Sequence, residues 1–248
     1  MGEPLVDWAL QLARGHLGGL DQRWRHTLGV AHRATEFSHL LPPSELDVLV
    51  SAAYLHDIGY APELAVTGFH PLDGARYVRA LGHERLACLI AFHSGARAEA
   101  DQRGFAAELA EFDEEASLVA CALTYCDLVT GSDGRRVQLS ERLGELFERY
   151  GPDTPVARAA RRSAAEFCAI VQVVEEILTR ACAATGARSP DVLADEQERA
   201  SSVHCGEYAA ERSGESECHV VRSRGEHMFD TYSTGVSLSD PNRIATHG

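Results

Sequence analysis

Residues that could ligate a metal ion meet at one short motif, His56-Asp57-Ile58-Gly59. The histidine and aspartate are adjacent and follow an apolar segment that is typical of a helix. Neighbouring ligands at a helix end project in different directions, so both could reach ions in one cavity. Gly59 would let the chain turn away without crowding that cavity. The motif therefore predicts a metal site at a helix end.

Two further candidate ligands come from other segments. His26 shares a helix face with Val30 and Phe37, an inward-pointing stripe. Asp127 ends the apolar stretch 118–127, where an unpaired buried carboxylate is costly. Taken singly, a buried histidine is more often a core residue, and a lone aspartate could simply serve helix packing. Together, imidazole and carboxylate ligands favour Mn, Fe, Zn, Ni or Co over a thiolate zinc site.

The order His … His-Asp … Asp resembles the HD superfamily of metal-dependent phosphohydrolases, in its H-D-I-G variant, over residues 20–180. The resemblance implies a compact helical bundle. It also implies that four residues hold one metal ion: His26, His56, Asp57 and Asp127.

Two more histidines extend the resemblance to two-metal HD proteins, including the HD-GYP group. His70, in His70-Pro71-Leu72-Asp73-Gly74, resembles the His-Pro-x-x-Gly element, and His93 stands where that group carries its next ligand. Asp57 would then bridge two ions. However, Tyr60 replaces the lysine that follows H-D-I-G, Phe92 replaces one histidine of a pair, and the G-Y-P signature is missing. Hydrolysis of cyclic dinucleotides is therefore not expected.

The resemblance implies hydrolysis of a phosphate ester of a small molecule, with nucleotides among the candidates, by a metal-activated water. The expected cofactor is one or two divalent ions (Mn, Fe, Mg, Ni, Co or Zn). Asp57 would be the central catalytic residue. Arg97, four residues after His93, and Arg33, two turns from His26, are the candidates to hold the phosphoryl oxygens.

Two alternatives remain open at this point. The same ligands resemble those of HD-type di-iron oxygenases, so oxidation is the second candidate chemistry. The third is a catalytically silent metal-binding sensor domain. The metal that is bound, and a requirement for dioxygen, would separate the first two.

The elements that must position these residues are predicted to be helices, and the fold class to be all-α. Asp21 is expected to cap a helix that ends before Pro42-Pro43, and Ser44 with Asp47 resembles a capping box for the next one. Pro71 suits the first turn of another helix. Three further helical segments are expected, at 84–93, 115–128 and 156–184, with pocket-shaping loops at 60–69 and 95–112.

Composition divides the 248-residue chain into a domain at 1–186 and a tail at 187–248. Only nine of the 62 tail residues are Leu, Ile, Val or Phe, so we expect the tail to be disordered.

The net charge of −14, with arginine as the only basic residue besides histidine, disfavours nucleic acid as a partner. The expected partner is a small phosphorylated substrate, and the sequence leaves the oligomeric state open. No segment is long and apolar enough to span a membrane. The N-terminal residues do not resemble a signal peptide, and the seven cysteines are scattered, so we expect a cytoplasmic protein with reduced thiols.

Overall fold

The computed structural model describes residues 4–185, which are helical apart from turns and one isolated antiparallel bridge between Thr130 and Arg136. This confirms the all-α prediction. The α-helices are α1 (Leu5–Leu17), α2 (Asp21–Ala34), α3 (Pro43–Leu55), α4 (His70–Ala80), α5 (Glu84–Phe92), α6 (Ala96–Arg103), α7 (Ala106–Leu109), α8 (Leu118–Leu128), α9 (Leu139–Tyr150) and α10 (Pro155–Thr185). Three short 3-10 helices join them: η1 (Thr35–His39), η2 (Ile58–Tyr60) and η3 (His93–Gly95).

The apolar residues of α2, α3, α4, α5 and α8 form the main core. The stripe along α2 and η1 points inward as predicted, because Val30 of α2 and Phe37 of η1 are fully buried and His26 is 2% exposed. Helix α3 contacts α1, α2, α5 and α8, so its C-terminal end lies among several other helices. This arrangement places the His56-Asp57 motif in the interior of the fold.

The predicted helix starts at Asp21 and Ser44 differ from the structure. Asp21 is the first residue of α2 rather than its cap, and it pairs with Arg25 one turn later. Helix α3 begins at Pro43, a position where the fixed backbone angle of proline suits a first turn, so no capping box forms at Ser44. In α8, by contrast, the Ser117 side chain accepts a hydrogen bond from the backbone N–H of Ala120.

The predicted loop at 95–112 contains two helices, α6 and α7. Helix α6 follows two consecutive left-handed residues, Ser94 and Gly95. Its sequence carries little apolar patterning, but Ala96, Ala98 and Ala100 are small enough to pack closely against their neighbours. Tertiary packing therefore stabilises a helix that periodicity does not indicate.

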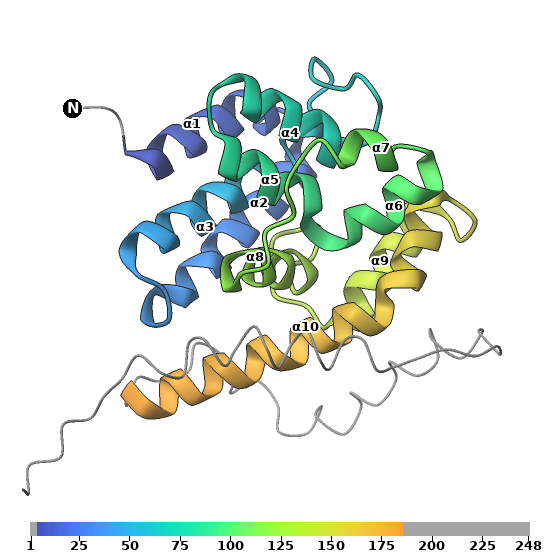
Figure 1. The fold of residues 1–248 in the computed structure, drawn as a ribbon. Helices are drawn as coiled ribbons and strands as arrows, with labels where there is room; N and C mark the ends of the chain where they lie inside the picture. The colour runs from blue at the N-terminus through green and yellow to red at the C-terminus, as the bar shows by residue number, and fades with distance from the viewer. Residues whose placement is uncertain (1–3, 186–248) are drawn as a thin grey trace, which may run out of the picture. The chain divides into compact units, whose positions relative to one another are not determined.

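Helices α9 and α10 form one side of the described region, and α10 contacts α6, α8 and α9 (Figure 1). A second apolar cluster lies between them, made of Leu128, Leu143, Ala160 and Phe167. The predicted helix at 156–184 is thus confirmed with slightly wider bounds. Helix α9, which the sequence analysis did not identify, begins with a capping box formed by Gln138 and Glu141.

The predicted disordered tail lies outside the described residues. Within residues 4–185, no helix has the length and apolar character needed to cross a membrane. Cys88, Cys121 and Cys126 are free, as expected, whereas Cys168 is disulfide-bonded, which the expectation of reduced thiols did not include.

Candidate metal centre

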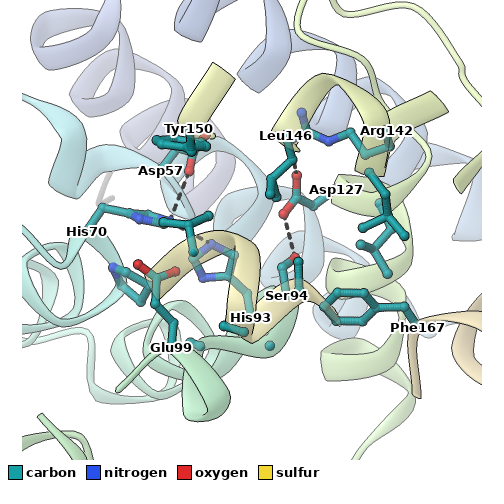
Figure 2. A pocket seen from close by; sticks show the side chains of 18 of the residues that line it. Asp57, His70, His93, Ser94, Glu99, Asp127, Arg142, Leu146, Tyr150 and Phe167 are labelled. Carbon is teal, nitrogen blue, oxygen red and sulfur yellow. Dashed lines mark hydrogen bonds and ion pairs between the residues drawn. The ribbon is translucent and has the colours of Figure 1, made fainter. Parts of the chain in front are cut away.

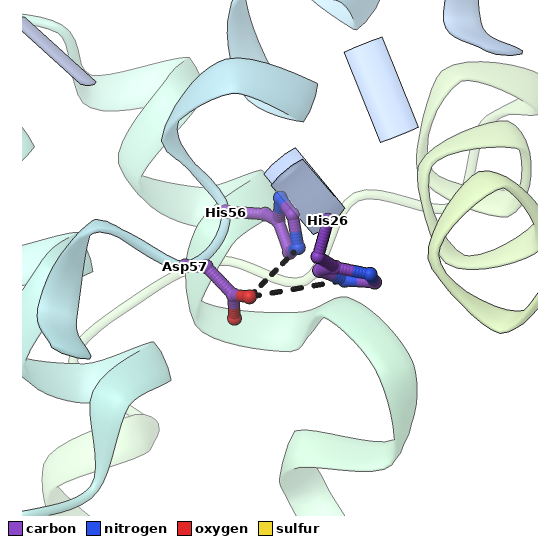
Figure 3. Close-up of side chains that lie close together, drawn as sticks. All are labelled: His26, His56 and Asp57. Carbon is purple, nitrogen blue, oxygen red and sulfur yellow. Dashed lines mark ion pairs between the residues drawn. The ribbon is translucent and has the colours of Figure 1, made fainter. Parts of the chain in front are cut away.

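His26, His56 and Asp57 form the first group of potential ligands (Figure 3). Their ligand atoms lie within 4.8 Å of one another. Oδ2 of Asp57 is 3.3 Å from Nε2 of His56 and 3.8 Å from Nε2 of His26. All three side chains are buried, although they come from α2 and from the end of α3. The fold thus brings together residues that are 30 positions apart in the sequence.

Asp57, His70 and His93 form a second group, so the two groups share Asp57. Oδ1 of Asp57 is 3.4 Å from Nε2 of His70, and Nε2 of His93 lies 3.3 Å from the same nitrogen. His70 is the first residue of α4, and His93 follows the last residue of α5. The two carboxylate oxygens of Asp57 therefore face histidines of different groups.

Three of the four histidine rings are fixed by the same hydrogen bond. The Nδ1–H groups of His26, His56 and His93 donate to the backbone carbonyls of Gly131, Ala53 and Ile90, at 3.1, 2.8 and 2.6 Å. Because Nδ1 carries the proton in each neutral ring, Nε2 carries the lone pair and points into the cluster. This is the orientation that a metal-binding histidine requires.

Asp127 of α8 lies beside the first group. Its Oδ1 is 3.0 Å from Nε2 of His26 and accepts a hydrogen bond from Nη2 of Arg142 at 3.1 Å. Its Oδ2 accepts a hydrogen bond from the hydroxyl of Ser94. Ser94 has a φ of 46°, an unfavourable value for a non-glycine residue, and its hydroxyl is held against Asp127.

Burial and charge act in opposite directions on the acidic groups. Burial alone would raise the pKa of Asp57, but the neighbouring positive charge of Arg23 holds that pKa well below its usual range. Burial would also raise the pKa of Asp127, which His26 and Arg142 likewise hold well below its usual range. Both carboxylates are therefore ionised at neutral pH and available to a cation.

Burial favours the neutral form of three of the four histidines. Burial lowers the pKa of His26, His70 and His93, because an imidazolium loses its hydration in the interior. Burial also opposes charging of His56, but the neighbouring Asp57 and Asp127 outweigh it and raise the pKa of that ring. Neutral imidazole beside ionised carboxylate is the donor set that a divalent ion needs.

One buried atom indicates that the cluster suits a cation. Nε2 of His56 is buried and makes no hydrogen bond. A buried polar atom without a partner is costly, and a metal ion at this position would satisfy it. The residues present therefore fit a divalent ion with mixed nitrogen and oxygen ligands.

Tyr60 stacks against the second ligand group. Its ring lies 4.0 Å from that of His70 with an interplanar angle of 18°, and the guanidinium carbon of Arg23 lies 3.9 Å from its centroid. Two planar groups cannot cover the same ring face at these distances, so Arg23 and His70 occupy opposite faces. The Tyr60 hydroxyl lies 3.1 Å from that of Tyr150 in α9. This stack fixes the orientation of His70.

The two predicted phosphate-binding arginines are not at the cluster. Arg33 is buried and donates to the carbonyl of Val129 at 3.2 Å. Arg97 is exposed and pairs with Glu114 on the surface, because α6 turns its side chain away from His93. Closeness in sequence to a ligand was an inadequate guide, since helix geometry decides the direction of each side chain.

Two other arginines stand at the cluster, and the sequence analysis named neither. Nη1 of Arg23 donates to Oδ2 of Asp57 at 2.5 Å, and Nη2 of Arg142 lies 3.3 Å from Nε2 of His26. Arg23 precedes His26 by three residues, and helical spacing alone would have placed both on one face. Arg142 had no comparable signal, because α9 follows all of the candidate ligands in the sequence.

The helical fold and its buried cluster of histidines and aspartates define an all-α domain with a candidate metal centre. Residues 23–131 match the HD domain family, and this part of the chain is therefore an HD domain. HD domains are typically metal-dependent phosphohydrolases. No curated protein and no solved structure matched the chain. Helix α9, which contributes Arg142 and Tyr150, and helix α10 lie outside the matched residues.

Proposed function

We propose that this protein is a metal-dependent phosphohydrolase that cleaves a phosphate ester of a small molecule. The observation that carries the proposal is the sharing of Asp57 by two groups of ligands, of which only His70 is not fully buried. A carboxylate that faces histidines on both oxygens is suited to bridging two cations. The HD domain at residues 23–131 supports the same chemistry.

His26, His56, Asp57 and Asp127 would hold one ion, and His70 and His93 would complete a second site with Asp57. A divalent ion, when bound, lowers the pKa of water and polarises a phosphoryl oxygen. The protein's own contribution is to fix the ligands. Backbone carbonyls hold three imidazole rings, Tyr60 holds His70, and Ser94 holds Asp127.

Arg23 and Arg142 would bind the phosphoryl oxygens of the substrate. Each guanidinium already lies against a carboxylate of the cluster, within reach of a group bound there. Planar guanidinium groups bind phosphate with two parallel hydrogen bonds, and they stay charged at any working pH. In the transition state they would neutralise charge that develops on the phosphoryl oxygens.

The test begins with the metal content of the full-length protein as purified. Phosphate release from a panel of phosphate esters is then measured under argon with Mn²⁺ or Mg²⁺, beside oxygen uptake by the iron-loaded protein. We expect phosphate release that needs no oxygen. Turnover that requires oxygen and releases no phosphate would replace this proposal with the oxygenase chemistry. Metal binding without any turnover would favour a sensor domain.

A further inference from the structure

A pocket opens on the second ligand group and continues along α9 and α10 (Figure 2). At its inner end lie Asp57, His70, His93 and Asp127. The free space measures about 80 Å³. Pockets that enclose drug-sized ligands measure roughly 300–1,000 Å³, so this one suits a much smaller molecule.

The lining away from the ligands is mainly apolar. Leu128, Leu143, Leu146, Ala160 and Phe167 line it, and four of them belong to the buried cluster between α8, α9 and α10. Leu146 is only half-buried and packs against that cluster. These five residues form the apolar wall of the pocket. An aliphatic chain that packed against this wall would remove apolar surface from water.

The polar side chains of the pocket lie at the ligands or are engaged with protein partners. Ser94 donates to Asp127, and Glu99 is paired with Arg103 at 2.6 Å. Arg149, exposed at the pocket, donates to Gln22 at 3.4 Å. Among the described lining residues, these leave few polar groups to read the edge of a nucleobase.

The rings of Tyr60 and Phe167, which also line the pocket, are occupied. Arg23 and His70 cover both faces of Tyr60, and the Tyr150 hydroxyl lies against that of Tyr60. Phe167 is 3% exposed and is packed in the apolar cluster. Tyr60 and Phe167 therefore offer no open ring face on which a base could stack, the usual way of holding one.

We infer that the substrate is a phosphate monoester of a short aliphatic alcohol rather than a nucleotide. The phosphate would lie among the ligands, Arg23 and Arg142, and the aliphatic part against Leu146 and its neighbours. This inference rests on the proposed function for the position of the phosphate. What it adds to that function is that the apolar wall binds the aliphatic part of the substrate.

Binding can be measured separately from hydrolysis. Titration calorimetry of the Mn²⁺-loaded full-length protein under argon would compare n-butylphosphonate, methylphosphonate and AMP; the two phosphonates have a P–C bond in place of the hydrolysed P–O bond. Each buried methylene is worth roughly fourfold in affinity. We expect n-butylphosphonate to bind at least about tenfold more tightly than methylphosphonate or AMP, because three further methylenes would reach the wall.

A variant then tests the wall. Leu146→Asn should remove most of the difference between the two phosphonates while methylphosphonate binding and metal content stay unchanged. Leu81→Asn, on an exposed leucine outside the pocket, is the matched control, and Leu146→Met should keep the preference if the asparagine variant folds poorly.

The outcomes separate the two proposals. AMP binding as tightly as n-butylphosphonate, or an unchanged phosphonate ratio in folded Leu146→Asn, would overturn the inference and leave the proposed function standing. A clear preference for n-butylphosphonate without release of phosphate from any ester, n-butyl phosphate included, would overturn the proposed function and support the apolar wall.

Discussion

Arg142 of α9 donates a hydrogen bond to Asp127 of α8 at 3.1 Å, which joins a helix outside the matched HD domain to a candidate metal ligand inside it. Both side chains are nearly buried, with exposed fractions of 12% and 10%. Arg142 contributes a positive charge beside Asp127 that residues 23–131 alone would lack. It also makes α9 part of the candidate active site.

Replacement of this arginine, Arg142→Gln, should reduce kcat/KM for phosphate esters by about 100-fold, because a charged hydrogen bond to the substrate is lost. Steady-state kinetics and metal analysis of the same preparation would check this. The metal content should persist, since the ligands remain. Arg158→Gln is the control: Arg158 is exposed on α10 and contacts Gln102. Equal losses in the two variants would contradict a role for Arg142.

Asp57→Ala should abolish detectable turnover and remove at least one metal ion per chain. The physical reason is that both ligand groups contain Asp57, and alanine offers no oxygen to either. Metal analysis by mass spectrometry and a phosphate-release assay would measure the two effects. His83→Ala should change neither, because His83 stacks on Trp8 away from the cluster. Similar behaviour of the two variants would show that the ligand assignment is wrong.

Gly59→Ala should destabilise the fold by about 3 kcal/mol, as expected for severe overpacking. A Cβ at this position would lie 2.1 Å from the carbonyl oxygen of His70 and 2.7 Å from the backbone nitrogen of Gly74. The turn after Asp57 would then have to move away from α4. Gly15→Ala, in open space on α1, should instead stabilise by about 0.8 kcal/mol. Urea unfolding of both variants would test the contrast.

The dependence of the free energy of unfolding on acid pH should arise in part from Arg85. This residue pairs with Glu45 at 2.6 Å and with Glu115 at 2.8 Å. Hydrogen bonds from Arg85 lower the pKa of both carboxyl groups, although burial opposes this. A lowered folded-state pKa gives stability that is present above the ordinary pKa, near 4.3 for glutamate, and is lost as the pH falls through the folded-state value.

Arg85→Gln should therefore lower the free energy of unfolding by about 1 kcal/mol at pH 7, after allowance for solvent screening at this partly exposed site. The difference from the parent protein should shrink as the pH falls below 4. Denaturant titrations from pH 3 to pH 7 would measure it. Arg180→Gln, at an exposed pair within α10, should change little. A difference that is constant with pH would exclude the ion pairs as its cause.

The sequence by itself was sufficient for the helical class and for the main ligand candidates. The apolar spacing in 115–128 and 156–184 indicated helices that the structure contains, the first from Leu118 onward, and the His56-Asp57-Ile58-Gly59 motif indicated the chemistry. These features are local, because helical periodicity and adjacent ligands are properties of short segments.

Only the tertiary structure decided which charged groups and which surfaces meet the ligands. Arg97 is four residues from His93 yet faces Glu114, whereas Arg142 is 116 residues from His26 and lies 3.3 Å from its ring. Side-chain direction on a helix, and the packing of α9 against α8 and α10, set these distances. Neither depends on spacing along the chain, so Arg142 and the apolar wall became visible only in the folded protein.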